Sequence, residues 1–197
     1  MNNSDQGRLK VITKETIREL PVVKFEGRIH VVDTAEKAAK AFAELKEEER
    51  LGFDTEKKPT FVKGDYNHTA LVQLSTPTDA YLFQLKKIGF GEELRTLLEN
   101  PAIEKLGVSI SDDLKELKRV SPFRPAGFTE LADSAKENKI PYFGLRNLAA
   151  FFLGRRLSKG QQVSNWENGT LTKPQQIYAA TDAWVALKIH DGMRDLV

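Results

Sequence analysis

The 197-residue sequence contains no cysteine, and this absence excludes several kinds of site. Disulfide bonds, thiolate zinc sites, iron–sulfur clusters and a cysteine nucleophile all need the missing thiol. Histidine is also scarce, because only His30, His68 and His190 are present and their positions match no common metal-binding spacing. Any metal must therefore be held mainly by oxygen atoms, and carboxylates with hard cations are the favoured combination.

The sequence also lacks a strong net charge and a long hydrophobic run. It has 30 Lys and Arg against 28 Asp and Glu, a formal net charge of +2, which excludes binding to nucleic acid or membranes by bulk charge but leaves local basic patches open. The longest apolar run, Leu148 to Leu153, is far shorter than the roughly 18–20 residues of a membrane span. Because the polar N-terminal stretch has no apolar segment before a cleavage site, we expect a cytoplasmic protein.

The length and the absence of repeats or Gly/Ser/Pro-rich linkers indicate one domain. The first stretch is polar and charged, and we expect a mobile N-terminal extension over residues 1–22 before a domain over residues 23–197.

Period-two patterns predict an α/β fold with a mixed sheet. Residues 68–75 and 80–85 read as two strands joined by residues 76–79, which makes an antiparallel hairpin. Further strands are predicted over residues 28–32, 51–56, 102–108 and 128–131. The hairpin is incompatible with an all-parallel doubly wound sheet, so we expect a mixed central β-sheet with an antiparallel meander, flanked by helices.

Capping patterns locate two of the predicted helices. Asp33 and Glu36 resemble a capping box, and the helix that follows is expected to run to about residue 49. Thr172 and Gln175 form a second box with Pro174 in the first turn, before a long helix that ends near residue 193. Other helices are predicted over residues 92–98, 112–120 and 145–153.

Asp54 and Glu56 form the first candidate site. They stand two apart on a predicted strand, so both side chains lie on one face with Cα atoms roughly 6–7 Å apart. Taken alone, the pair also fits a solvent-exposed strand end. Leu51 and Phe53 favour a buried strand that delivers carboxylates to its carboxyl end, where ligands gather in open α/β sheets.

A second acidic element follows the predicted strand at residues 102–108. Leu114 and Leu117 mark the buried face of the next helix, and at 100° per residue Asp113 lies about 40° from Leu117, whereas Asp112 lies about 140° away. Asp113 is therefore the inward-facing carboxylate. Asp112 is expected to satisfy backbone N–H groups in the first helical turn.

Tyr178 and Asp182 form the third element. Their spacing of four residues places the phenol and the carboxylate on one helix face. They could be a surface hydrogen-bonded pair, but the surrounding alanines, Ala179, Ala180, Ala183 and Ala186, indicate that this helix approaches something closely. Packing of that small-residue face on the sheet would carry Asp182 toward Asp54.

Taken in order, these elements resemble the DEDD superfamily of 3′–5′ exonucleases, in the subgroup with tyrosine in its third motif, such as the Werner syndrome exonuclease domain and ribonuclease D. The resemblance covers roughly residues 28–193. It rests on GFDTE (52–56), ALVQLS (70–75) with YLF (81–83), GVSISDDLKEL (107–117), GLRNLAAFFLG (144–154), the K-x4-S-x-W element (159–166) and YAATDAW (178–184).

The resemblance implies a ribonuclease H-like fold and assigns the site residues. It makes Asp54, Glu56, Asp113 and Asp182 the metal ligands and Tyr178 the catalytic tyrosine. The related subgroup has histidine five residues before the last aspartate, where this chain has Ile177. The chain departs from the Werner-type pattern after Glu56, where Lys57 and Lys58 replace an aromatic residue. This puts base stacking beside the first motif in doubt and leaves a solvated loop and a phosphate contact as alternatives.

The implied activity is metal-dependent hydrolysis of DNA or RNA, single-stranded or at a 3′ end, with release of nucleoside 5′-monophosphates. Two Mg²⁺ or Mn²⁺ ions would relieve the repulsion among four carboxylates and promote the reaction. Asp54 is expected to bridge the ions, Glu56 and Asp182 to complete one site, and Asp113 to hold the second ion through waters. Tyr178 is expected to orient the attacking water, because a phenol with a pKa near 10 is a poor general base.

Several further residues are candidates for nucleic-acid contact. Lys57 and Arg146 are basic residues near the motifs, and Arg155, Arg156 and Lys159 precede the loop that contains Ser164 and Trp166. Trp166 fits either packing or base stacking. Two other functions remain open, a catalytically silent nucleic-acid-binding module and a ribonuclease H-like endonuclease. The complete acidic set argues against the first, and Tyr178 is unexplained by the second.

Overall fold

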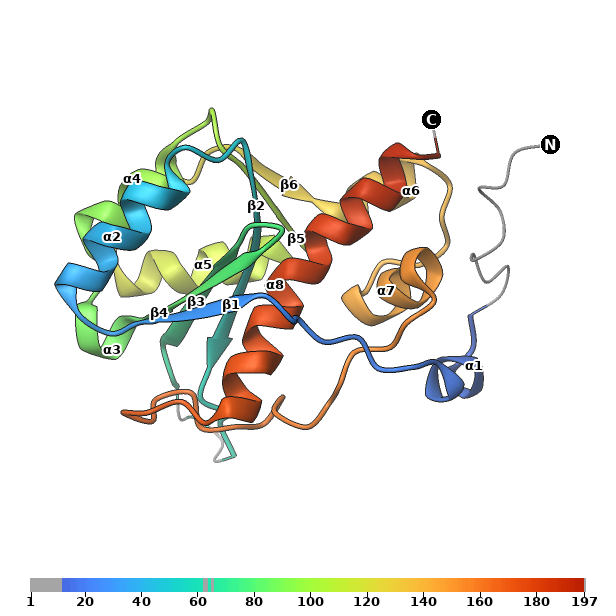
Figure 1. The fold of residues 1–197 in the computed structure, drawn as a ribbon, viewed down its shortest axis with the longest axis horizontal. Helices are drawn as coiled ribbons and strands as arrows, with labels where there is room; N and C mark the ends of the chain where they lie inside the picture. Colours follow the sequence, from blue (N-terminus) through green and yellow to red (C-terminus); the bar gives the residue numbers. More distant parts are fainter. Residues whose placement is uncertain (1–11, 62–63, 65, 197) are drawn as a thin grey trace.

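The computed structural model describes residues 12–61, 64 and 66–196. Its strands are β1 (Arg28–Val32), β2 (Arg50–Lys57), β3 (Thr69–Ser75), β4 (Asp79–Gln84), β5 (Glu104–Gly107) and β6 (Phe128–Glu130). They form one six-stranded sheet in the order β1-β4-β3-β2-β5-β6 (Figure 1). β3 pairs with β2 and with β4 in antiparallel fashion. The parallel pairs are β1 with β4, β2 with β5, and β5 with β6. The predicted mixed sheet with an antiparallel meander is confirmed.

Helices cover both faces of this sheet (Figure 1). The long helix α8 (Lys173–Arg194) crosses one face and contacts β1 to β5, and α6 (Leu131–Glu137) and α7 (Leu145–Leu153) pack on α8. A separate hydrophobic core on the other face includes side chains of α2 (Ala35–Leu45), α4 (Glu92–Glu99) and α5 (Ile110–Val120). The two short remaining helices are α1 (Lys14–Glu19) and α3 (Leu85–Ile88).

Strand β2 places apolar side chains on one face of the sheet and carboxylates on the other. Leu51 and Phe53 join the core beneath α2, α4 and α5. The intervening residues face α8, and at Gly52 an added Cβ would lie 2.0 Å from the carbonyl oxygen of Ala183. Because successive strand residues alternate in direction, the same face that begins with Gly52 continues with Asp54 and Glu56.

One of the two capping predictions is confirmed and the other is wrong. α8 begins as predicted, with Thr172 and Gln175 in a reciprocal capping box and Pro174 in the first turn. In α2 the cap is Thr34, whose hydroxyl accepts from the Lys37 N–H, and the predicted Asp33 cap is wrong. The predicted extension of this helix to residue 49 is also wrong, because it ends at Leu45 and the chain enters β2 at Arg50.

The N-terminal stretch contains structure that the sequence patterns did not predict. Residues 1–11 of the expected extension lie outside the described residues, but α1 follows with a capping box between Thr13 and Thr16. The boundary at residue 22 stays a prediction. In the part of the chain that the structure describes, no helix combines the length and apolar character needed to cross a bilayer.

The contact between β2 and α8 makes a direct prediction for Gly52→Ala. The added methyl must push the helix away from the strand, which we expect to lower the free energy of unfolding by about 1–3 kcal/mol. Urea denaturation followed by circular dichroism measures this change. Gly169→Ala is the matched control, because no described atom lies within 4 Å of a Cβ added there. Equal stability of the two variants would contradict the close approach.

Candidate active site

Three carboxylates from two elements meet at the carboxyl end of β2. Asp54 and Glu56 come from the strand and Asp182 comes from α8. Each offers one oxygen atom, and these oxygens all lie within 4.8 Å of one another. Asp54 and Glu56 are half-buried, while Asp182 is 9% exposed. The structure therefore brings together the first and third acidic elements of the sequence.

Small side chains on α8 explain why Asp182 reaches the strand. Ala179, Ala180 and Ala183 are fully buried between the helix and the sheet. Thr181 fixes the helix further, because its hydroxyl accepts a 3.0 Å hydrogen bond from the backbone N–H of Phe25. The alanine pattern thus predicted both the close approach and its consequence for Asp182.

Asp113 approaches the same cluster from α5. Its Oδ1 accepts a 2.5 Å hydrogen bond from the hydroxyl of Thr55, which stands between the two acidic residues of β2. Asp112 points into solvent, with a side chain that is 85% exposed and 3.6 Å from the ammonium of Lys115. Helical phase therefore identified the inward carboxylate correctly. Asp113 does not share the 4.8 Å cluster of the other three acids.

Glu130 holds the start of α5, a role that the sequence patterns did not reveal. Its carboxylate accepts from the backbone N–H groups of Ser109 at 3.0 Å and Ile110 at 2.8 Å. Ser109 has a left-handed backbone with φ of 66°, which for a serine stores strain. Asp112 was expected to satisfy these first-turn groups, and that expectation is wrong because the helix begins at Ile110, two residues earlier than predicted.

The acidic cluster carries strongly raised pKa values. Burial, followed by the charges of Asp182 and Asp113, raises the pKa of Asp54 and raises that of Glu56 to about 9. Burial also raises the pKa of Asp182 to about 7 and that of Asp113 to about 6, although hydrogen bonds from Tyr178 and Thr55 oppose these shifts. The site therefore resists full ionisation on its own and favours a compensating positive charge.

Tyr178 lies one helical turn before Asp182 and lines the same cavity. Burial and the negative charges of Asp182 and Glu56 raise the pKa of its phenol. The hydroxyl therefore stays protonated near neutral pH, which suits a hydrogen-bond donor better than a general base. The ring packs on Trp166, with ring centroids 5.9 Å apart.

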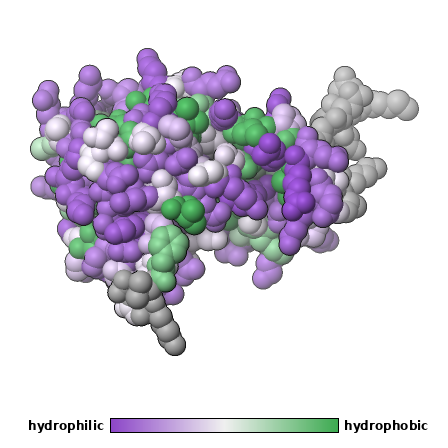
Figure 2. All heavy atoms as spheres, turned by 90° about the horizontal axis from the view of Figure 1, so that it is seen from below, coloured by the Kyte–Doolittle hydropathy of each residue, from purple (hydrophilic) through white to green (hydrophobic). Residues whose placement is uncertain are grey.

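A cavity of about 520 Å³ opens over the acidic cluster, and we refer to it as the acidic cavity. Asp54, Glu56, Tyr178 and Asp182 form one part of its wall. Another part comes from the start of α7 and from the connection between α7 and α8, through Gly144, Leu145, Arg146, Asn147, Leu157 and Gln162. The face of the molecule seen from below in Figure 2 is largely hydrophilic, with small separate hydrophobic areas.

The predicted basic contacts are distributed unequally around this cavity. Arg146 lines it, and its charge lowers the pKa of Asp182. Lys57 is exposed at the end of β2, and its charge lowers the pKa of Asp113. Arg156 and Lys159 line an adjoining cavity instead, while Arg155 is exposed and lines neither of the two. Contact of these residues with nucleic acid stays a prediction.

Ser164 and Trp166 are both engaged within the protein. The Ser164 hydroxyl accepts from Gln175 Nε2 at 2.9 Å and donates to Gln161 at 3.1 Å, which ties the loop to the start of α8. Trp166 is 1% exposed. Packing is therefore the interpretation that fits Trp166, and stacking on a base does not, because its ring is covered.

Known proteins resemble this chain over most of its length. The model of the 3′–5′ exonuclease family matches residues 29–197. The mouse protein named bifunctional 3′-5′ exonuclease/ATP-dependent helicase WRN is 33% identical over 187 residues, which cover 90% of this chain and 13% of that protein. The exonuclease mut-7 homolog of Aedes aegypti is 28% identical, covering 85% of this chain and 27% of its own length. The chain thus spans a minor part of these relatives.

Solved structures give the same fold. The Nibbler EXO domain of Aedes aegypti superimposes with a TM-score of 0.78 at 26% identity, covering 86% of this chain and 88% of that one. Escherichia coli RNase D superimposes with a TM-score of 0.75 at 22% identity, covering 85% and 46% of the two chains. The fold is therefore ribonuclease H-like, as the resemblance implied. With its family match over most of its length, the chain belongs to the 3′–5′ exonuclease family of the DEDD superfamily.

Proposed function

We propose that this chain hydrolyses phosphodiester bonds of DNA or RNA from the 3′ end and releases nucleoside 5′-monophosphates. The observation that carries the proposal is the meeting of Asp54, Glu56 and Asp182 within 4.8 Å in an open cavity. Family membership supports the reaction class, and the position of Tyr178 supports the tyrosine subgroup.

The donor set fits hard divalent cations. Its ligand atoms are carboxylate oxygens, which Mg²⁺ and Mn²⁺ prefer, and burial together with the charges of Asp182 and Asp113 raises the pKa of Glu56, so a bound cation would favour its ionised form. Asp54, Glu56 and Asp182 would hold one cation, and Asp54 with Asp113 would hold a second. When bound, such a pair supplies an activated water and stabilises the leaving 3′ oxygen.

The chain's own groups position the reactants. Tyr178 would orient the attacking water through a hydrogen bond, since its raised pKa keeps the hydroxyl protonated. Arg146 stands in the wall of the acidic cavity, where its fixed positive charge can neutralise a substrate phosphate. Thr55 and Glu130 keep Asp113 in place through hydrogen bonds to its carboxylate and to the start of α5.

Divalent cations should stabilise the fold, and this effect does not depend on catalysis. At a cation concentration about 100 times the dissociation constant, the gain is about 2.7 kcal/mol, or roughly 5–10 °C in Tm for a chain of this size. Thermal unfolding with Mn²⁺ and with EDTA measures the shift. Asp182→Asn should lose most of it, whereas the exposed Asp112→Asn should keep it.

The pH dependence of this stability follows from the same carboxylates. Without metal, the folded state binds more protons than the unfolded state between about pH 4 and 9, because the folded pKa values of Asp182 and Glu56 are raised to about 7 and 9. Stability from these groups therefore falls as pH rises through that window. In EDTA, Asp182→Asn should melt above the wild type at pH 8 and close to it at pH 5. A wild-type Tm that Mn²⁺ does not change at pH 8 would contradict the metal site.

The reaction itself is tested on DNA and RNA oligonucleotides labelled at either end. With Mg²⁺ or Mn²⁺, a 3′ label should leave as a mononucleotide and a 5′ label should pass through a ladder of shortening products. EDTA or Asp54→Asn should stop the reaction, and Asp112→Asn should retain the wild-type rate. Internal cuts would indicate a ribonuclease H-like endonuclease, and binding without turnover would indicate a silent module.

A further inference from the structure

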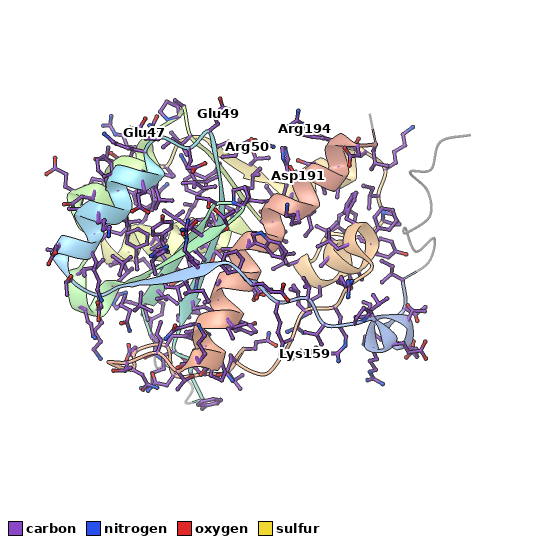
Figure 3. All side chains as sticks on the ribbon, in the orientation of Figure 1. Glu47, Glu49, Arg50, Lys159, Asp191 and Arg194 are labelled. Atoms are coloured by element: carbon purple, nitrogen blue, oxygen red, sulfur yellow. The ribbon has the colours of Figure 1, made fainter. Side chains whose placement is uncertain are left out.

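A second cavity, of about 540 Å³, adjoins the acidic one. Five of its lining residues are cationic: Lys14, Arg18, Arg146, Arg156 and Lys159. Among the described residues, no carboxylate lines it. We refer to it as the basic cavity. Figure 3 labels Lys159 on the connection between α7 and α8.

Helix α1 contributes one wall of the basic cavity. Lys14, Ile17 and Arg18 line it, and their spacing of three and four residues places them on one helix face. Glu15 and Glu19 each follow one of these cations in sequence, so they lie about 100° around the helix from them. The short helix therefore directs its cations into the cavity and its acids elsewhere.

Hydrogen bonds from distant parts of the chain fix α1 in this place. The backbone N–H of Ile12 donates to the Tyr142 hydroxyl at 2.7 Å before the helix. After it, Arg156 Nε donates to the carbonyl of Leu20 at 2.9 Å. The backbone of Arg156 also bonds Pro21 and Val23, each at 3.0 Å. The wall is thus a docked part of the fold.

The cations of this cavity differ from several other charged side chains of the fold in their lack of close ion pairs among the described residues. In the ranges that the structure describes, none of the five forms an ion pair with a carboxylate. The cleft at the other end of the molecule differs, because Asp191 lies 3.5 Å from Arg50 and 3.8 Å from Lys188 there. Figure 3 shows Arg50 and Asp191 at the upper end of the view and Lys159 at the lower end. Uncompensated positive charge favours an anionic ligand.

The two cavities are neighbours. Arg146, Asn147 and Leu157 line both of them. A strand whose 3′-terminal nucleotide occupies the acidic cavity has its other phosphates on the 5′ side of the bond that is cleaved. Those phosphates are the anions available at the neighbouring opening.

We propose that the basic cavity binds backbone phosphates of the nucleic-acid strand on the 5′ side of the cleaved bond, with Lys14 and Arg18 of α1 as contacts. This inference rests on the proposed exonuclease function. α1 precedes residue 29, where the family match begins, so these two contacts are additional to the matched domain. The cavity should therefore increase affinity for strands longer than a few nucleotides without taking part in the chemistry.

Binding is measured first, in EDTA, by fluorescence anisotropy with a 5′-labelled single strand of about ten nucleotides. Lys14→Ala/Arg18→Ala should weaken binding roughly tenfold and lower the slope of log affinity against log salt by about 1.4, at about 0.7 per lost phosphate contact. Lys40→Ala/Lys136→Ala is the matched control, because it removes two exposed lysines on α2 and α6 and the same net charge. Lys14→Arg/Arg18→Lys should keep wild-type binding, which separates charge from a folding defect.

Hydrolysis with Mg²⁺ then locates the contact along the strand. The alanine pair should raise KM for the ten-nucleotide strand and leave kcat unchanged, and both constants for a dinucleotide should stay at wild-type values. Two results would place the contact at the terminal nucleotide and overturn the proposal. One is an equal rise in KM for the ten-nucleotide strand and for the dinucleotide. The other is displacement of the strand by a mononucleotide at a similar concentration. Unchanged anisotropy, or no binding by the wild type, would also overturn it. If the variant loses binding but the wild type does not hydrolyse the strand, the proposed function is wrong and the phosphate contact stands.

Discussion

Helix α8 touches strand β2 where Gly52 faces the carbonyl oxygen of Ala183, and a Cβ at Gly52 would lie 2.0 Å from that atom. This contact sets the distance between the strand that contains Asp54 and Glu56 and the helix that contains Asp182. The alanines of the helix and the glycine of the strand thus determine a chemical property of the site, because they bring carboxylates closer than their charges favour. Thr55 and Glu130 then add Asp113 from a third element.

The close approach of the strand and the helix also determines the charge of the site. The cluster retains protons at neutral pH unless positive charge is supplied, as the raised pKa of Glu56 shows. Positive charge beside the cluster comes from Arg146 in the shared wall and from Lys57 at the end of β2, and the basic cavity adds five cationic lining residues, Arg146 among them. A net charge of only +2 therefore conceals two adjoining regions of opposite sign. Such an arrangement suits a ligand that carries many phosphates and is consumed from one end.

Local patterns in the sequence were sufficient where the physical cause is local. The β3–β4 hairpin, the capping box of α8 and the inward direction of Asp113 all follow from neighbouring residues and were predicted. Features that depend on distant partners were not predicted. α1 is held by Tyr142 and Arg156, more than a hundred residues away, and its sequence alone resembles a solvated segment. Glu130 reaches the start of α5 across a loop, and the burial of Trp166 depends on its packing against α8.

We propose that Asp54, Glu56, Asp113 and Asp182 form one site for a pair of divalent cations. Crystals soaked in Mn²⁺ and measured at the manganese absorption edge test it most directly. We expect two anomalous peaks, one among Asp54, Glu56 and Asp182 and one between Asp54 and Asp113. No peak at these carboxylates, or peaks confined to other acidic residues such as Glu47 to Glu49, would contradict it.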